Sequence, residues 1–347
     1  MQKFLVAFLF TIISVSMGYS AKAQYHASLI GFYNLENLYD TVDNPIVDDE
    51  EFLPNSERHY NTAIFLDKLD KLTSVLTQLG IDVNPDGFAL LGVCEIENDT
   101  VLHALTNHKS LKARGLKIVH YNSPDRRGID VGLLYNPKYF APLYSEPLFV
   151  QLPGGSKDAY FTRDILYVKG ILDGDTIHVL VGHWPSRSGG EERSIPARAA
   201  AAGVCKGVVD SLMAISKQTK VIIMGDLNDD PISPSLTKIL GASGSTSKLK
   251  DGGLYNPWYD FYKRGIGTIA YQDAWGLFDQ VVISKAWLDK EQAGYFFQKA
   301  TIFNREFLIQ QTGRYKGYPK RTWDGSTYNY GYSDHLPVFL TMLKKVN

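Results

Sequence analysis

The stretch that decides the fold is Val221-Ile-Ile-Met-Gly-Asp226-Leu-Asn228-Asp-Asp230, in which an apolar run meets several acids and an amide. The apolar, partly β-branched run 221–224 predicts a buried strand. Asp226 and Asn228 follow at its end, where loops from several strands can converge on one cleft. Taken alone, these polar residues fit an Asx turn and a helix cap before Pro231 equally well. The rest of the chain therefore decides between a turn and a site.

The same combination of an apolar run and a polar end recurs along the chain. The polar ends are Asn34 and Glu36 after 27–33, Glu95 after 88–93, His183 after 177–182, and Asp334 with His335 before 336–342. Two more acids precede strand-like runs, Asp130 before 131–135 and Asp279 before 280–283. Each of these residues alone has a structural explanation: an acid in a loop, a histidine in the core, or a turn. The order and spacing of the whole set indicate a site.

The residue types in this set point to a hard metal ion and to proton transfer. Carboxylate and amide oxygens are ligands for Mg²⁺, Mn²⁺ or Ca²⁺, in contrast to the Cys and His ligands of a structural zinc site. Two histidines among acids suggest proton transfer or phosphate binding, with each imidazole oriented by a carboxylate.

Between the apolar runs the chain alternates strands with helices. Helical spacing predicts a helix over 64–79 and another from Pro196 to about 216. The runs 164–171 and 177–182 predict a hairpin. Gly-, Tyr- and Ser-rich loops cover 241–275 and 305–333. No repeat or low-complexity linker divides the chain, so we expect a single α/β catalytic domain over residues 24–347, with sheets packed on each other and helices outside.

Composition sets further limits. The 347 residues include 36 Lys and Arg against 37 Asp and Glu, a formal net charge of -1. This balance excludes binding of nucleic acid through positive charge spread over the whole chain, but a local basic groove remains possible. A hydrophobic content of 44% is that of an ordinary globular protein and excludes disorder. Two cysteines, Cys94 and Cys205, exclude a disulfide-dense scaffold.

Residues 1–23 have the three parts of a secretory signal peptide. Lys3 is followed by an apolar run over 4–17, and Ala21-Lys22-Ala23 precedes Gln24. A membrane anchor is the alternative, but the run is shorter than the roughly 20 residues that span a bilayer. We expect cleavage near Ala23-Gln24, a secreted or periplasmic protein without stable membrane insertion, and a monomer.

Seven stretches carry the polar set in one order, and they span residues 27–342. They are Phe32-Tyr-Asn34-Leu-Glu36-Asn37, Gly92-Val-Cys-Glu95-Ile-Glu97-Asn98, Gly128-Ile-Asp130-Val-Gly-Leu-Leu-Tyr135, Val181-Gly-His183-Trp-Pro185, Met224-Gly-Asp226-Leu-Asn228-Asp229, Phe278-Asp279-Gln280-Val-Val-Ile283 and Tyr332-Ser-Asp334-His335-Leu-Pro-Val338. Together they resemble the endonuclease/exonuclease/phosphatase superfamily, in the form of its secreted bacterial members. The resemblance implies the deoxyribonuclease I-like fold, a four-layer αββα sandwich of two mixed β-sheets flanked by helices, and metal-dependent cleavage of a phosphoester.

The resemblance also implies a metal site. Glu95 matches the main metal ligand, Asn34 the amide beside it, and Glu36 and Asp334 acids that share the metal or lie near it. The expected cation is Mg²⁺, with Mn²⁺ or Ca²⁺ as alternatives.

Catalytic roles follow in the same way. Asp226 and Asn228 match the pair that positions the nucleophile and the phosphate, and His335 the histidine at the reacting phosphate, oriented by Asp279. Either Asp226 or His335 can be the general base. His183 matches a second catalytic histidine, expected to help the leaving oxygen depart as an imidazolium or to be replaced in that role by metal-bound water, with Asp130 as its partner. Arg127 and Arg187 are expected to contact phosphate. Cys94, where many relatives have Gln, is expected to be a buried thiol.

The substrate is less well defined by the sequence. A nucleic acid is the first hypothesis, because aromatic and basic residues alternate over 255–265 and a second aromatic loop over 315–330 precedes Asp334. The alternative for 255–265 is a packed loop that carries core aromatics. A sphingomyelinase-like enzyme would need an exposed apolar hairpin, for which 293–297 is the candidate. A nucleotide or inositol phosphatase is a further alternative. A non-catalytic binding protein would have lost Glu95, Asp226, Asn228 or His335, and all four are present.

Overall fold

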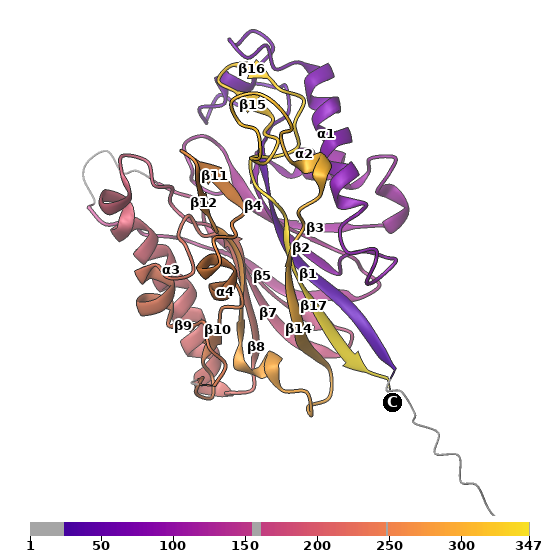
Figure 1. Ribbon diagram of the computed structural model, residues 1–347, viewed down its shortest axis with the longest axis vertical. Helices are drawn as coiled ribbons and strands as arrows, with labels where there is room; N and C mark the ends of the chain where they lie inside the picture. The colour runs from indigo at the N-terminus through magenta and orange to yellow at the C-terminus, as the bar shows by residue number, and fades with distance from the viewer. Residues whose placement is uncertain (1–23, 155–160, 248, 347) are drawn as a thin grey trace, which may run out of the picture.

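A computed structural model of the chain describes residues 24–154, 161–247 and 249–346, so the expected signal peptide lies outside the described residues. Two β-sheets lie face to face in the middle of the molecule, with helices on their outer sides (Figure 1). None of the helices within these ranges is long and apolar enough to cross a membrane.

The first sheet has the strand order β14-β17-β1-β2-β4-β3. Its strands are β1 (Tyr25–Leu38), β2 (Leu90–Ile96), β3 (Lys117–His120), β4 (Asp130–Tyr135), β14 (Tyr295–Ile302) and β17 (Val338–Lys345). The central pair β1 and β2 is parallel and the other neighbours are antiparallel, so the sheet is mixed.

The second sheet has the strand order β5-β6-β7-β8-β13-β10-β9. Its strands are β5 (Phe140–Leu148), β6 (Ile165–Leu172), β7 (Asp175–His183), β8 (Lys220–Asp226), β9 (Ala242–Ser243), β10 (Leu254–Tyr255) and β13 (Asp279–Ser284). The parallel pairs are β7 with β8 and β9 with β10. The expected hairpin is confirmed as β6 and β7, joined through Asp173 and Gly174, both with positive φ. Two small hairpins stand apart, β11 (Ile269–Tyr271) with β12 (Ala274–Gly276) and β15 (Trp323–Asp324) with β16 (Thr327–Tyr328).

Helices cover the outer face of each sheet. They are α1 (Thr62–Leu76), α2 (Asp99–Thr106) and α3 (Glu191–Ile215). The short helix α4 (Tyr259–Lys263) instead packs Phe261 and Tyr262 against the core between the sheets. Short helical turns are η1 (Glu50–Phe52), η2 (Lys112–Arg114), η3 (Ser235–Leu240), η4 (Lys285–Leu288) and η5 (Glu306–Leu308). Buried side chains of α1 and α2 pack on the first sheet, and those of α3 on the second. A separate apolar core, which includes Ile30, Val181 and Met224, fills the space between the sheets. The expected four-layer arrangement is therefore confirmed.

The sheets bring the polar strand ends to one edge of the sandwich. The parallel register pairs Asn34 with Cys94, beside Glu95, and it pairs His183 with Asp226. Asp279 opens β13 opposite Asp226. The β1–β2 ladder is irregular at this point, and Glu36, Asn37 and Glu95 all have φ near +50°. This strained geometry, rare for residues other than glycine, is typical of functional positions.

Glycines allow the two parallel strands of the second sheet to approach closely. Gly182 and Gly225 face each other one residue before His183 and Asp226. A Cβ atom on Gly225 would lie 2.1 Å from the carbonyl oxygen of Gly182. The absence of a side chain at Gly225 therefore allows the two strands to approach and the side chains that follow to meet.

Two boundaries differ from the sequence prediction. Helix α1 ends at Leu76 rather than at 79, and α3 begins at Glu191, so that Pro196 lies inside it. Glu191 and Glu192 complement the positive end of the helix, which favours the earlier start. Proline removes one backbone donor from the helix, but the buried face of α3, which includes Ala201 and Val209, packs on the second sheet and holds it.

Candidate active site

Seven polar side chains that the sequence singled out converge at the edge where β1, β2, β7 and β8 end. They are Asn34, Glu95, His183, Asp226, Asp279, Asp334 and His335. Their strands belong to both sheets, so the site lies over the junction of the two sheets. Most of these side chains are buried, and Glu95 and Asp334 are the more exposed, at 17% and 24% of the side chain.

Asn34 links the two sheets at the centre of the site. Its Nδ2 donates to Glu95 Oε1 at 3.0 Å and to Asp226 Oδ2 at 3.1 Å. Its Oδ1 accepts the backbone N–H of Glu36 at 2.8 Å, which fixes the direction of the amide. The second oxygen of Glu95 accepts the backbone N–H of Asn37 at 3.0 Å. Asn34 thus holds the two carboxylates close together.

His335 and Asp279 form a buried pair. His335 Nδ1 lies 2.6 Å from Asp279 Oδ2, which also accepts the hydroxyl of Thr268 at 2.6 Å. The opposite nitrogen, Nε2, lies 3.7 Å from Asp226 Oδ2 and 3.9 Å from Asp334 Oδ1. Burial acts to lower the pKa of His335, but the charges of Asp279 and Asp226 outweigh it and raise the pKa well above its usual value. His335 is therefore an imidazolium that directs its Nε2–H toward the centre of the site.

His183 differs from His335 in its protonation state. Its Nε2 lies 3.7 Å from Asp226 Oδ2 and 3.9 Å from Glu95 Oε1, and Nδ1 is buried with no partner within the described residues. Burial and the nearby cations Arg163 and Arg127 lower the pKa of His183 well below its usual value. In this state His183 is neutral, which argues against the imidazolium expected from the sequence.

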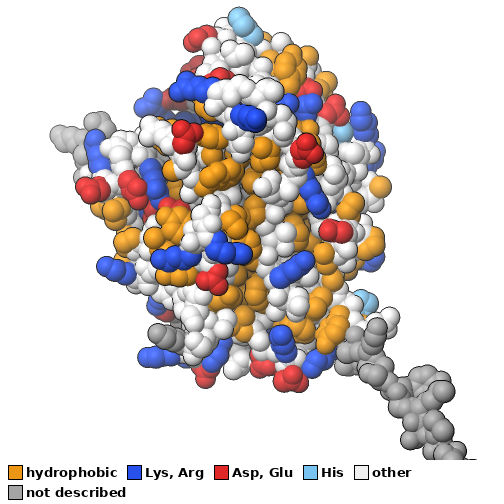
Figure 2. All heavy atoms as spheres, viewed as in Figure 1, with side chains coloured by type: hydrophobic (Ala, Val, Ile, Leu, Met, Phe, Trp, Pro, Cys, Tyr) orange, Lys and Arg blue, Asp and Glu red, His pale blue; other side chains and the backbone are white. Residues whose placement is uncertain are grey.

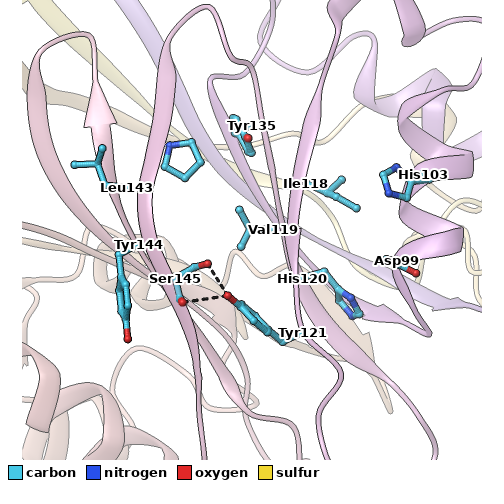
Figure 3. A pocket seen from close by; sticks show the side chains of 11 residues that line it. Asp99, His103, Ile118, Val119, His120, Tyr121, Tyr135, Leu143, Tyr144 and Ser145 are labelled. Carbon is cyan, nitrogen blue, oxygen red and sulfur yellow. Dashed lines mark hydrogen bonds between the residues drawn. The ribbon is translucent and has the colours of Figure 1, made fainter.

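Asp130 is not the partner of His183. Its Oδ2 lies 3.0 Å from His120 Nε2, and its Oδ1 accepts the backbone N–H and the hydroxyl of Ser123. The prediction was wrong because β3 pairs with β4 and brings His120 beside the start of β4. His120 lines a separate open cavity of about 660 Å³ between the edge strands β3 and β5, where Tyr121 donates to Ser145 (Figure 3). This cavity holds none of the seven convergent side chains.

Glu36 holds the loop that contains Thr322 and Trp323 and is not placed as a metal ligand. Its two carboxylate oxygens accept the backbone N–H groups of Thr322 at 2.6 Å and Trp323 at 3.3 Å. Lys68, on α1, lies fully buried and donates to the hydroxyl of Thr322 at 2.8 Å. Burial raises the pKa of Glu36 to about 7, and the charge of Lys68 counteracts this rise. We therefore correct the expectation that Glu36 shares the metal.

Asn228 closes the other side of the site. Its backbone N–H donates to Asp226 Oδ1 at 3.0 Å, and its Nδ2 donates to the carbonyl of Trp184 at 2.9 Å. The same carbonyl accepts Arg163 Nη2 at 2.9 Å, and Arg163 is paired with the buried Asp125 at 3.1 Å. The buried cation near His183 is thus part of the scaffold that positions Asn228.

The two arginines predicted to bind phosphate differ in their surroundings. Arg187 donates to the carbonyl of Asn228 and to Asp230, and it stacks on Phe278 at 4.5 Å, so most of its donors are used within the protein. Arg127 is half exposed, and its main polar neighbour is Asp125 at 3.8 Å. Arg127 is therefore the freer of the two for a substrate.

Several residues that support the site were not predicted from the sequence. Lys68 lies on the buried face of α1, Thr268 precedes β11, and Arg321 donates to Asp334 Oδ2 at 3.0 Å. The one sequence signal that could have found Arg321 is its place in a basic stretch shortly before Asp334.

A divalent cation fits the cluster. Burial, with Asp279 and Glu95 nearby, raises the pKa of Asp226 to about 7 even though His335 opposes the rise. Such crowding of carboxylates is relieved by a cation. Possible ligand atoms of Asp226, Asp279 and His335 lie within 4.8 Å of one another, as do those of Cys94, His183 and Asp226. The thiol of Cys94 is buried, which raises its pKa well above the usual value, so it is protonated as expected and a poor ligand.

Glu95 and Asp226, which both accept a hydrogen bond from the amide of Asn34, are the carboxylates that would hold the cation. Asp334, expected as a further acid near the metal, lies 3.9 Å from His335 Nε2 and accepts a hydrogen bond from Arg321. When bound, the cation supplies positive charge to a phosphoryl oxygen and to the leaving oxygen. The chain itself supplies an imidazolium donor at His335, an acceptor at Asp226 and a neutral imidazole at His183, which suit the binding of a phosphate and the orientation of a water molecule.

Comparisons with known proteins agree with this geometry. The model of a family described as Endonuclease/Exonuclease/phosphatase matches residues 29–344. Similar solved structures include a humanized TDP2 from D. rerio (12% identity, 91% of this chain and 98% of that chain, TM-score 0.54). Two others come from Bacteroides thetaiotaomicron: an endonuclease/exonuclease/phosphatase family protein (14%, 93% and 100%, TM-score 0.55) and a mannosyl-6-phosphatase (14%, 91% and 99%, TM-score 0.54). At these identities the likeness concerns the fold. No match was found among curated protein sequences.

Proposed function

Because the chain belongs to the endonuclease/exonuclease/phosphatase family, whose members are metal-dependent phosphoesterases, we propose that it hydrolyses phosphodiester bonds and acts as an endonuclease on nucleic acid. The proposed cation is Mg²⁺, with Mn²⁺ or Ca²⁺ as alternatives. The proposed location is outside the cytoplasm after cleavage near Ala23-Gln24, and the proposed state is a monomer.

One observation carries the proposal: the line of contacts from Asp279 through His335 to Asp226. His335 Nδ1 lies 2.6 Å from Asp279, and Nε2 lies 3.7 Å from Asp226, which Asn34 joins to Glu95. This line places a charged donor, a carboxylate acceptor and a candidate cation ligand around one point. A phosphoryl group needs these three elements for attack by water.

Two observations bear on the choice of substrate. The segment 314–321 carries four cations and no acid, and Arg321 within it contacts Asp334, which favours a substrate with more than one phosphate. The lipid-directed alternative called for an exposed apolar hairpin at 293–297. That region instead enters β14, where Tyr295 and Phe296 are 1% and 4% exposed.

The test uses purified residues 24–347 with Mg²⁺, Mn²⁺ or Ca²⁺ on plasmid DNA, RNA, bis-p-nitrophenyl phosphate, sphingomyelin and a hexose 6-phosphate. We expect metal-dependent nicking of DNA or RNA that Glu95→Gln and His335→Asn remove. The exposed Glu291→Gln and His26→Asn are matched controls expected to retain activity. Cleavage of sphingomyelin or of the hexose phosphate with intact nucleic acid would refute the endonuclease proposal. A lipid-directed enzyme or a phosphatase, the activity named for the mannosyl-6-phosphatase neighbour, would then replace it.

A further inference from the structure

A cavity of about 270 Å³ is lined in part by Arg321, the residue that donates to Asp334. One wall is the tip of the β11–β12 hairpin and the other is part of the basic segment 314–321. The lining residues are Ala270, Tyr271, Gln272, Asp273, Arg314, Tyr315, Tyr318 and Arg321.

Both walls are tied to the catalytic side chains. Arg321 Nη2 donates to Asp334 Oδ2 at 3.0 Å, and Asp334 is the neighbour of His335. On the other wall, Ile269 forms a β-bridge with His335, and Thr268 donates to Asp279. A group bound in the cavity would therefore be held close to a phosphate at His335.

The chemistry of the cavity combines aromatic rings with cations. The guanidinium groups of Arg314 and Arg321 lie 5.4 and 5.6 Å from the centre of the Tyr315 ring. Tyr318 packs beside Tyr315 with ring centres 5.8 Å apart, and Tyr271 is 72% exposed. Rings of this kind stack on flat bases, and guanidinium groups bind phosphate.

The hairpin tip adds polar groups where glycine is usual. A two-residue β-turn with positive φ at both positions favours Asn-Gly, but here Gln272 and Asp273 have φ of 48° and 62°. Tyr318 holds this strained turn, because its hydroxyl lies 2.6 Å from both the backbone nitrogen and Oδ1 of Asp273. The turn thus keeps an amide and a carboxylate at the cavity, and such groups pair with the edges of nucleobases.

We propose that this cavity binds the nucleotide next to the scissile phosphate, with its base against Tyr315 or Tyr271 and its outer phosphate at Arg314. The inference rests on the proposed function and assigns the substrate class of the same site. A hexose phosphate would place its single phosphate at His335 and supply no phosphate to Arg314, Lys316 and Lys320. A nucleic acid strand supplies a second phosphate to them, so the charge favours the strand.

The experiment compares variants on two substrates, a short single-stranded oligonucleotide and bis-p-nitrophenyl phosphate, which has neither a nucleobase nor a second phosphate. Tyr315→Leu should lower kcat/KM on the oligonucleotide by about 10-fold, because it removes a ring on which the base stacks. Activity on bis-p-nitrophenyl phosphate should stay within about twofold. Tyr315→Phe keeps the ring and should restore cleavage of the oligonucleotide.

Charge is tested by Arg314→Ala, which should weaken oligonucleotide binding and reduce the slope of log affinity against log salt by about 1. The matched control is Arg305→Ala, because Arg305 also stacks on an aromatic ring, Phe303 at 5.0 Å, but pairs with Asp82 away from the cavity. If the wild type cleaves the oligonucleotide and both Tyr315→Leu and Arg314→Ala cleave it equally well, the proposed subsite is refuted and the proposed function stands. A wild-type protein that cleaves hexose 6-phosphate, in a Tyr315-dependent way, and no oligonucleotide would overturn both the subsite and the proposed function.

Discussion

Asp226→Asn is expected to stabilise the metal-free protein while removing its activity. Burial raises the pKa of the Asp226 carboxyl from 3.8 to about 7. The folded state therefore binds this proton more tightly than the unfolded chain, and stability falls as the pH rises from about 4 through about 7. One pKa unit corresponds to about 1.4 kcal/mol, so the part lost between pH 5 and 7 is at most about 3 kcal/mol. Asparagine does not ionise and escapes this loss.

The substitution also has a cost that does not depend on pH. Asp226 Oδ2 accepts the amide of Asn34, and loss of this hydrogen bond removes about 1 kcal/mol. The pH dependence is therefore the distinguishing observation. In thermal unfolding with EDTA, the Tm of Asp226→Asn relative to the wild type should be higher at pH 8 than at pH 5 by about 5 °C.

Asp229→Asn is the matched control, and it is expected to destabilise the protein. Asp229 Oδ1 lies 2.7 Å from Nε of the fully buried Arg198. Removing the carboxylate leaves a buried guanidinium without its ion-pair partner, which should cost about 3–5 kcal/mol at both pH values. A Tm difference for Asp226→Asn that is equal at pH 5 and pH 8, or that becomes more negative at pH 8, would refute the reasoning about crowded carboxylates.

Three further predictions concern the partners, the cation and the packing. Asp130→Asn should leave kcat within about twofold, because Asp130 bonds His120 and Ser123; a loss as large as that of Asp279→Asn would contradict this. Mg²⁺ or Mn²⁺ should raise the Tm of the wild type at pH 8 and have little effect on Glu95→Gln, which thermal scans with and without EDTA measure; equal shifts would place the cation elsewhere. Gly225→Ala should cost about 3 kcal/mol in urea unfolding, because its Cβ would lie 2.1 Å from Gly182 O, whereas Gly203→Ala, in open space on α3, should stabilise by about 0.5–1 kcal/mol. An unchanged midpoint for Gly225→Ala would show that β7 and β8 separate easily.

The four layers were implied by the family resemblance, whereas most of the convergent side chains could be predicted from local patterns. An apolar run that ends in a polar residue marks the end of a buried strand, and Asn34, Glu95, His183 and Asp226 all occupy such ends. Parallel neighbours then bring these ends to the same edge of the sandwich. Nothing beyond strand identity and order was needed for this part.

The partners of these side chains were not predictable in the same way. Lys68 occupies a helix whose apolar spacing gives no reason to expect a buried lysine, and its burial depends on the later loop that carries Thr322. Asp130 was paired with the wrong histidine because the register of β3 against β4 brings His120 to it. Contacts between residues far apart in the chain are set by packing, and a single sequence does not contain that information.

The two histidines show how this packing sets the chemistry. Both are buried beside Asp226, so burial alone would make both neutral. His335 gains Asp279 at 2.6 Å and retains its proton, whereas His183 lies within the field of Arg163 and Arg127 and loses its proton. The site therefore holds one imidazolium, and its Nε2–H faces the carboxylate of Asp226. A neutral imidazole protonates a leaving oxygen less readily than an imidazolium does, so we expect His335 to be the charged donor and His183 to act through hydrogen bonding.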